Sequence, residues 1–449
     1  MKYKTINCLQ RKKLCDCVFI RNLYDVIIII MLYYETMIFK NSDKLQIVLD
    51  EFVAKKEAAG LNLLVCKDGK EIGYWESGLA DVAAGSAYSR DTIVRLYSMS
   101  KPVTAVAAMI LMEEGKLDFA TELYRYLPEF KDVKVCTDRG RKGNPKPASR
   151  PILIQDLLNM TSGYGYGAWG EGSFYGEHLT SDLINDLNED EKDGGKNQIT
   201  TREFARRIAQ IPLNFEPGTE YNYGYSADIL GAVIEEVAGT SFGDFMKEHI
   251  FKPLAMNDTD FYVPDSKQSR LAKVYRSVED WSDKKNPGVR HLELFTSCNL
   301  GIQDKMNHQP AFESGGAGLC STVDDYMKFA LMLTKGGQLD GRRILSENTV
   351  RRLSDSRLMP SVQQTFDIKM PHLAGYSYCN LVRVAANPGS CNVFTSKGEF
   401  GWDGWLGPYV SVDRKTGLSI VMTMQRCDSG TTSAARKAKN IIYSTIDNI

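Results

Sequence analysis

Hydrophobic positions near the start of the chain first follow a helical spacing and then form two short apolar runs. The helical set recurs every three or four residues, which predicts a helix with one buried face: Leu45, Val48, Leu49, Phe52 and Val53. Ser42 precedes this set as the expected N-cap. The apolar runs 61–66 and 71–75 flank Asp68-Gly69, a turn pair that predicts a β-hairpin.

The C-terminal part of the chain repeats both patterns in the opposite order. Runs at 407–413 and 418–424 flank a polar turn at 414–417 and predict two further antiparallel strands. A final helix is expected over 434–446. We therefore expect the two ends of the chain to share one antiparallel sheet with helices on its faces.

Between the two ends the pattern is mostly helical. A helix is expected over 228–237, with Gly239 ending it. Thr322 is the expected N-cap of another helix, whose inward positions are Tyr326, Phe329, Ala330 and Leu333. The polar stretches 138–149 and 188–198 are expected to be surface loops.

Composition narrows the function classes. The chain has 449 residues, 43% hydrophobic and 25% charged, which is typical of a globular protein with a large core. Its net charge of −1 gives no reason to expect a nucleic acid or an anionic membrane as partner. The ten cysteines contain no Cys-x-x-Cys pair and the five histidines show no metal-ligand spacing. We therefore expect neither a disulfide framework nor a metal site.

Residues 1–40 differ in character from the rest. A basic stretch at 2–13 precedes an apolar run at 26–32, which is too short to span a bilayer comfortably and has no small-residue cleavage site after it. We expect a poorly ordered or non-native extension, with Met37 as the working start, and keep a membrane anchor as the less favoured alternative. The missing signals and unpaired cysteines favour a cytoplasmic location.

Ser98 and Lys101 are the first candidate for chemistry. They lie three residues apart at the start of a strongly apolar helical run at 102–112, so both side chains should lie on one helix face. A desolvated lysine can lose its proton and act as a base for the serine, and the helix N-terminus favours a developing oxyanion. The alternative is a capping serine beside a solvated lysine.

Two later segments are further candidates. A Pro-Gly turn at 217–218 delivers three tyrosines ahead of a helix, and one of them could share the general-base role. The alternative is that these tyrosines cap an apolar core. In the segment 400–407, glycines would let the backbone approach a ligand and offer an N–H to an oxyanion. The alternative there is a glycine-rich turn with exposed tryptophans.

Taken in order, these motifs resemble the serine β-lactamase-like family of class C β-lactamases, DD-peptidases and family VIII carboxylesterases, most closely its esterase and transesterase branch. The resemblance covers about residues 45–447 and rests on Ser98-x-x-Lys101, Thr161-Ser162-Gly163, Pro217-Gly218-Thr219 with Tyr223, Ser314-Gly315-Gly316 and Trp402-Asp403-Gly404. It implies an α/β (α+β) β-lactamase/transpeptidase-like fold. An antiparallel sheet flanked by helices would come from 41–130 and 335–449, and a mostly helical part from 131–334.

The resemblance also implies roles for single residues. Ser98 resembles the acylated nucleophile, Lys101 its base partner and Tyr223 the tyrosine of the family's Tyr-x-Asn motif. The N–H of Trp405, which follows Gly404, would complete an oxyanion hole with the N–H of Ser98.

Two departures from the β-lactamase pattern bear on the substrate. Tyr225 stands where β-lactamases have the asparagine of that motif, and Trp402 stands where their Lys-Thr-Gly motif has its cation. Both departures favour the esterase branch. The literal Lys-Thr-Gly at 415–417 is expected to be a polar hairpin turn.

The resulting expectation is a serine hydrolase that forms an acyl-enzyme with a small-molecule ester or amide and needs no metal or organic cofactor. A β-lactamase or D-amino-acid peptidase is one alternative, and a non-catalytic scaffold is another. Aromatic side chains suggest an apolar acyl or aryl substrate: Tyr164, Tyr166, Trp169, Trp402 and Trp405. The sequence predicts no oligomeric state.

Overall fold

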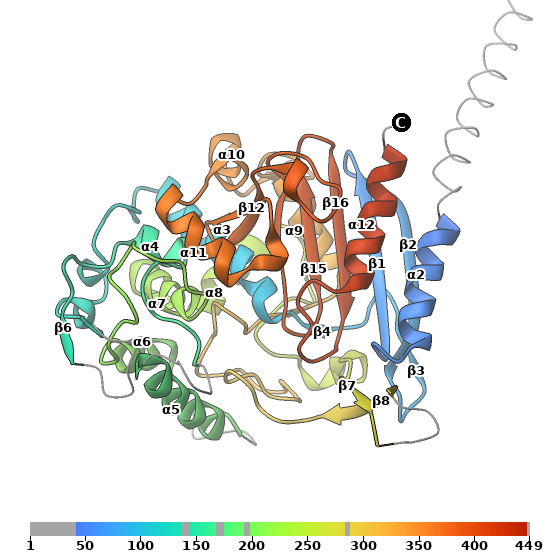
Figure 1. Ribbon diagram of the computed structural model, residues 1–449, viewed down its shortest axis with the longest axis horizontal. Coiled ribbons are helices and arrows are strands. Elements are labelled where there is room, and N and C mark those ends of the chain that lie inside the picture. Colours follow the sequence, from blue (N-terminus) through green and yellow to red (C-terminus); the bar gives the residue numbers. More distant parts are fainter. Residues whose placement is uncertain (1–41, 137–143, 168–174, 193–197, 283–287, 447–449) are drawn as a thin grey trace, which may run out of the picture.

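The computed structural model (Figure 1) describes residues 42–136, 144–167, 175–192, 198–282 and 288–446. The expected N-terminal extension and Trp169 lie outside these ranges. Across the described ranges, no helix has both the length and the apolar character needed to cross a membrane.

One eight-stranded antiparallel sheet joins the two ends of the chain, as predicted. Its strand order is β12-β13-β14-β15-β16-β1-β2-β3. The strands are β1 (Gly60–Lys67), β2 (Lys70–Asp81), β3 (Ser86–Ala87), β12 (Tyr376–Cys379), β13 (Val382–Ala385), β14 (Phe400–Asp403), β15 (Tyr409–Asp413) and β16 (Leu418–Met424). The two ends of the chain meet where β1 pairs with β16, in a continuous register from Leu61↔Met424 to Lys67↔Leu418.

Alternate side chains of β1 supply two separate cores, because successive residues of a strand point to opposite faces. On one face Leu61, Leu63 and Val65 pack with α2 (Ser42–Ala54) and α12 (Ser433–Ile446). Figure 1 shows these two helices side by side along the sheet. On the other face Leu64 and Cys66 belong to the main core, and α9 (Val323–Thr334) contacts β1, β15 and β16. The predicted helices at both chain ends and after Thr322 are confirmed.

The remaining elements lie mostly between β3 and β12 in the sequence. The α-helices among them are α3 (Ser100–Glu113), α4 (Ile154–Leu158), α5 (Tyr175–Asp190), α6 (Thr201–Ile208), α7 (Ser226–Ala238), α8 (Phe242–Met246), α10 (Glu347–Asp355) and α11 (Pro360–Lys369). Two-stranded sheets accompany them: β4 (Val94–Arg95) with β9 (Cys320–Ser321), β5 (Lys134–Cys136) with β6 (Pro145–Pro147), β7 (Val274–Asp280) with β8 (Val289–Phe295), and β10 (Gln338–Leu339) with β11 (Arg342–Arg343).

Two details of this middle part bear on the predictions. Helix α7 ends at Gly239, whose φ of +71° is the left-handed conformation that glycine adopts without strain. The expected loop at 188–198 is wrong at its start, because α5 continues to Asp190. Asp190, the last residue of α5, accepts hydrogen bonds from the N–H groups of Gln198 and Ile199, which tie this helix end to the next segment.

Candidate active site

Ser98 lies in a single 3-10 turn, Tyr97–Met99, that runs directly into α3. Its side chain is partly exposed, whereas Tyr97 before it is buried and has a φ of +46°. This left-handed conformation is unusual for a bulky residue and is typical of a sharply turned functional segment. N–H groups in the first turn of a helix have no partner within the helix, so the N–H of Ser98 can serve an external acceptor.

Lys101 is completely buried and lies against Ser98. Its Nζ is 3.2 Å from Ser98 Oγ, 3.0 Å from the Tyr166 hydroxyl and 2.8 Å from the carbonyl oxygen of Gly316. All three partners are uncharged. Burial therefore lowers the pKa of the Lys101 amine to about 7, although the carboxylates of Asp228 and Asp403 partly oppose this shift. At neutral pH a large fraction of Lys101 is the free amine, which can accept a proton.

The carbonyl that holds Lys101 is fixed by a buried aspartate that the sequence analysis did not single out. Asp228 Oδ1, in the first turn of α7, accepts hydrogen bonds from Ser314 Oγ at 2.5 Å and from the Gly316 N–H at 3.0 Å. Thr104 of α3 donates to the Gly315 carbonyl at 2.7 Å. Gly316 also lies too close to this carboxylate for a side chain, because a Cβ there would be 2.7 Å from Asp228 Oδ2.

Tyr223 completes the group that the sequence predicted around Ser98. Its ring lies 4.6 Å from Lys101 Nζ, and its hydroxyl accepts a hydrogen bond of 2.8 Å from Trp402 Nε1. Burial raises the pKa of the Tyr223 phenol, while its hydrogen bonds with Ser98 and Trp402 partly oppose the rise. Ser98, Lys101 and Tyr223 therefore come together, and Tyr223 is a neutral phenol at neutral pH.

The two residues expected at the substrate side of the site lie behind it. Trp402 is 4% exposed and packs its ring against Tyr223 at 5.4 Å. Tyr225 is 3% exposed and packs edge-on against Tyr166 at 4.6 Å. Each therefore contacts a tyrosine that faces Lys101 and has little surface left for a ligand.

The other expected lining aromatics differ in their positions. Tyr164 is 1% exposed and packs against Phe130, so it belongs to the core. Tyr166 is partly exposed and bonds Lys101 directly, a contact that the sequence analysis missed. The Thr161-Ser162-Gly163 motif just before Tyr166 was the available signal for it.

Gly404 and Trp405 lie in a tight turn that follows β14. The N–H of Gly407 bonds the Gly404 carbonyl at 2.8 Å, so residues 404–407 form a β-turn with Trp405 at its second position. The N–H of that second residue takes no part in the turn's own hydrogen bond. A Cβ at Gly404 would lie 2.3 Å from the carbonyl oxygen of Leu96, so the turn contacts the chain two residues before Ser98.

The literal Lys-Thr-Gly at 415–417 lies in the turn between β15 and β16, as expected. Asp413 Oδ1 accepts hydrogen bonds there from the N–H groups of Lys415 and Thr416, at 3.0 and 3.2 Å. This segment is a polar hairpin turn.

Together, the antiparallel sheet, its flanking helices and the helical region define a β-lactamase/transpeptidase-like α/β fold. The family model described as Beta-lactamase matches residues 45–442. The chain belongs to the beta-lactamase family, whose members include esterases, transesterases and carboxypeptidases.

Individual relatives extend this result. The chain is 30% identical over 381 residues to Protein Rv1367c of Mycobacterium tuberculosis, covering 81% of this chain and 85% of that protein. It is 27% identical over 388 residues to Esterase EstB of Burkholderia gladioli, covering 84% and 89%. Among solved structures, EstCE1, "a hydrolase with promiscuous acyltransferase activity", superimposes with a TM-score of 0.71 at 24% identity, covering 92% of this chain and 100% of that one.

Proposed function

We propose that this protein is a serine hydrolase that cleaves small carboxylic esters through an acyl-enzyme on Ser98. The observation that carries the proposal is the buried Lys101 amine, whose hydrogen-bond partners are Ser98, a phenol and a carbonyl. A lysine in such surroundings can be neutral near pH 7 and act as a base toward the serine hydroxyl beside it.

The reaction follows from these positions. Lys101 takes the proton of Ser98 Oγ while that oxygen attacks the ester carbonyl, and the neutral Tyr223 hydroxyl beside it relays protons. The N–H groups of Ser98 and Trp405 bind the oxyanion that forms. The proton now held by Lys101 passes to the leaving alcohol as the C–O bond of the ester breaks. Water then attacks the acyl-enzyme by the same steps and releases the acid, which restores Ser98.

An ester is favoured over a β-lactam by the two residues that depart from the β-lactamase pattern. Trp402 supplies no cation for a β-lactam carboxylate, and its indole N–H is engaged by Tyr223. Tyr225 is buried behind Tyr166 and supplies no amide to a lactam side chain. The name of EstB, an esterase that aligns with most of this chain, supports the same substrate class.

The test compares an aryl ester with a chromogenic cephalosporin on the purified protein and on Ser98→Ala. Ser86→Ala, on the exposed edge strand β3, is the matched control. We expect ester turnover that disappears only in Ser98→Ala, with little cephalosporin turnover in any variant. A fluorophosphonate should add its mass to the Ser98 peptide of the wild type.

Other outcomes would contradict the proposal. Cephalosporin turnover above ester turnover would make the protein a β-lactamase. Ester hydrolysis that persists in Ser98→Ala would mean that Ser98 is not the nucleophile. Absence of both turnover and labelling would favour the scaffold alternative.

A further inference from the structure

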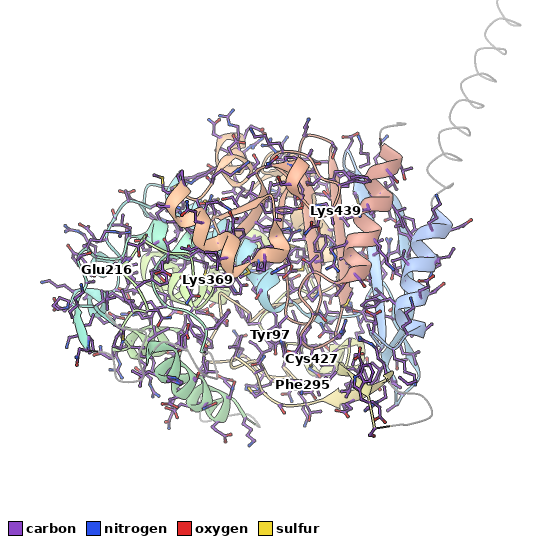
Figure 2. The ribbon with its side chains drawn as sticks, in the orientation of Figure 1. Tyr97, Glu216, Phe295, Lys369, Cys427 and Lys439 are labelled. Atoms are coloured by element: carbon purple, nitrogen blue, oxygen red, sulfur yellow. The ribbon has the colours of Figure 1, made fainter. Side chains whose placement is uncertain are left out.

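The indole of Trp405 is held on several sides next to the candidate nucleophile. Its ring packs against Tyr97 at 5.1 Å and against Phe295 at 5.6 Å. Its Nε1 donates a hydrogen bond of 2.9 Å to Asp428 Oδ1. Tyr97, Phe295 and Cys427 belong with Trp405 to one hydrophobic cluster beneath the active-site end of α3, and Figure 2 labels the first three together near β8.

The contacts around this indole extend to the β7–β8 hairpin. Arg276 of β7 lies 5.5 Å over the ring of Phe295, the last residue of β8, and 3.9 Å from Asp428 Oδ2. The N–H of Ser429 bonds the Trp405 carbonyl at 3.0 Å. The side chain and the carbonyl of Trp405 are therefore both fixed by partners. Its N–H, at the second position of the β-turn 404–407, takes no part in the hydrogen bond of that turn.

The two candidate oxyanion donors lie in segments that meet where the Tyr97 and Trp405 rings pack together. Tyr97 directly precedes Ser98 and holds a strained φ of +46°. Trp405 carries the second donor in its own backbone. The contact between the Tyr97 and Trp405 rings therefore packs together the two segments that carry these N–H groups.

We propose that the Trp405 side chain, anchored by Asp428 and packed between Tyr97 and Phe295, is the positioning device of the oxyanion site. It aims the N–H of Trp405 at the point that the N–H of Ser98 also reaches. The inference rests on the proposed function, since it assigns a role within that same acyl transfer. Preorganised donors contribute most of their effect in the transition state, so loss of the anchor should lower kcat and leave KM nearly unchanged.

The test removes the anchor from its exposed end. The Asp428 side chain is 66% exposed, so Asp428→Ala should leave the core intact. We expect kcat for an aryl ester to fall about tenfold in Asp428→Ala, less than the loss of a whole oxyanion donor. Asp428→Asn keeps an acceptor oxygen and should stay within about twofold of the wild type. Trp405→Phe should resemble Asp428→Ala, and the double variant should be no worse than either single one.

A second readout separates positioning from general damage. Sulfur accepts hydrogen bonds more weakly than oxygen, so a thionoester gains less from an oxyanion hole. The ratio of kcat/KM for the ester to that for its thionoester should fall in Asp428→Ala and Trp405→Phe. The matched control removes a similar indole–carboxylate hydrogen bond in the β7–β8 hairpin. There the exposed Trp281 donates from Nε1 to Glu279 at 3.2 Å. Glu279→Ala should leave both rates and their ratio unchanged.

The outcomes distinguish this inference from the proposed function. If Ser98→Ala abolishes hydrolysis but Asp428→Ala and Trp405→Phe leave kcat and the ratio unchanged, the positioning role is wrong and the hydrolase remains. Equal losses for ester and thionoester would also overturn the positioning role, because they would indicate a general structural defect. If Ser98→Ala keeps hydrolysing the ester, the proposed function itself fails.

Discussion

Replacing Lys101 with methionine should stabilise the protein at neutral pH while it abolishes the proposed hydrolysis. Methionine matches the length and apolar stem of lysine but carries no charge. Lys101 is fully buried, and its burial lowers the pKa of the amine from the usual 10.5 to about 7. A lysine with this shift costs folding free energy wherever the unfolded chain would hold the proton.

The magnitude follows from the pKa shift. At 1.36 kcal/mol per pKa unit the penalty is about 5 kcal/mol below pH 7 and about 4 kcal/mol at pH 7. It disappears above pH about 10.5, where the unfolded lysine is also neutral. The methionine leaves the buried Gly316 carbonyl without the lysine donor, which costs about 1–3 kcal/mol. Lys101→Met should therefore gain about 1–3 kcal/mol of stability at pH 7, and the gain should shrink by about 2 kcal/mol by pH 9.

The assay is urea unfolding of the wild type and Lys101→Met at several pH values between 6 and 9. Lys439→Met is the control, because this second buried lysine is ion-paired with Glu399 at 3.0 Å and its pKa is raised (Figure 2 labels it). That variant should lose about 1–3 kcal/mol throughout the range, since the buried Glu399 carboxylate loses its nearer cation and keeps only Arg383, at 3.7 Å. A Lys101→Met effect that is destabilising at pH 7, or that does not decrease with pH, would mean that Lys101 stays charged and would refute the reasoning.

Three further predictions follow from the same site. Because the neutral Lys101 amine is the base, kcat/KM for an ester should rise with pH through an apparent pKa of about 7, measured on wild type and on Ser86→Ala as control. Trp402→Phe keeps a smaller aromatic ring and removes the 2.8 Å hydrogen bond to Tyr223, so kcat should fall about tenfold and stability by about 1–3 kcal/mol. An unchanged kcat would argue against this bond. Gly404→Ala would bring a Cβ within 2.3 Å of the Leu96 carbonyl oxygen, so the variant should lose activity and about 1–3 kcal/mol of folding stability. Steady-state kinetics and thermal unfolding measure the two losses, and Gly389→Ala, where a Cβ has room, should change neither.

The sheet could be predicted because its central strands carry their signal locally. The hairpin of β1 and β2 has a turn pair between two apolar runs, and β15 and β16 repeat that pattern. The β7–β8 hairpin escaped prediction since its strands are mostly only half-buried and carry charged residues at several positions. Its long-range anchors, such as Phe295 against Trp405, are contacts that a local pattern does not contain.

The residues of the site that belong to short sequence motifs could be predicted. Those that reach the site only through tertiary contacts could not. Ser98 and Lys101 lie one helical turn apart, so their proximity follows from spacing alone. The hydrogen bonds of Lys101 to Tyr166 and Gly316 span 65 and 215 residues of sequence. Asp228 looks like an ordinary acid in the first turn of a helix, a position that the helix dipole favours in any protein.

Two buried lysines in this chain show what the placement of Asp228 achieves. Lys439 contacts the Glu399 carboxylate directly, and the pKa of its amine is raised. Burial lowers the pKa of the Lys101 amine even though a carboxylate is nearby, because the residue Gly316 stands between the amine and Asp228 and the two do not touch.

Through Gly316 the carboxylate positions Lys101 without touching it. Asp228 Oδ1 accepts hydrogen bonds from Ser314 Oγ and the Gly316 N–H, and these bonds fix the Gly316 carbonyl that Lys101 contacts. The amine is thus held in place by a dipole rather than by a full charge, and a dipole stabilises the ammonium form less than a carboxylate in contact would. A buried acid can therefore position a lysine next to a serine without making that lysine too weak a base.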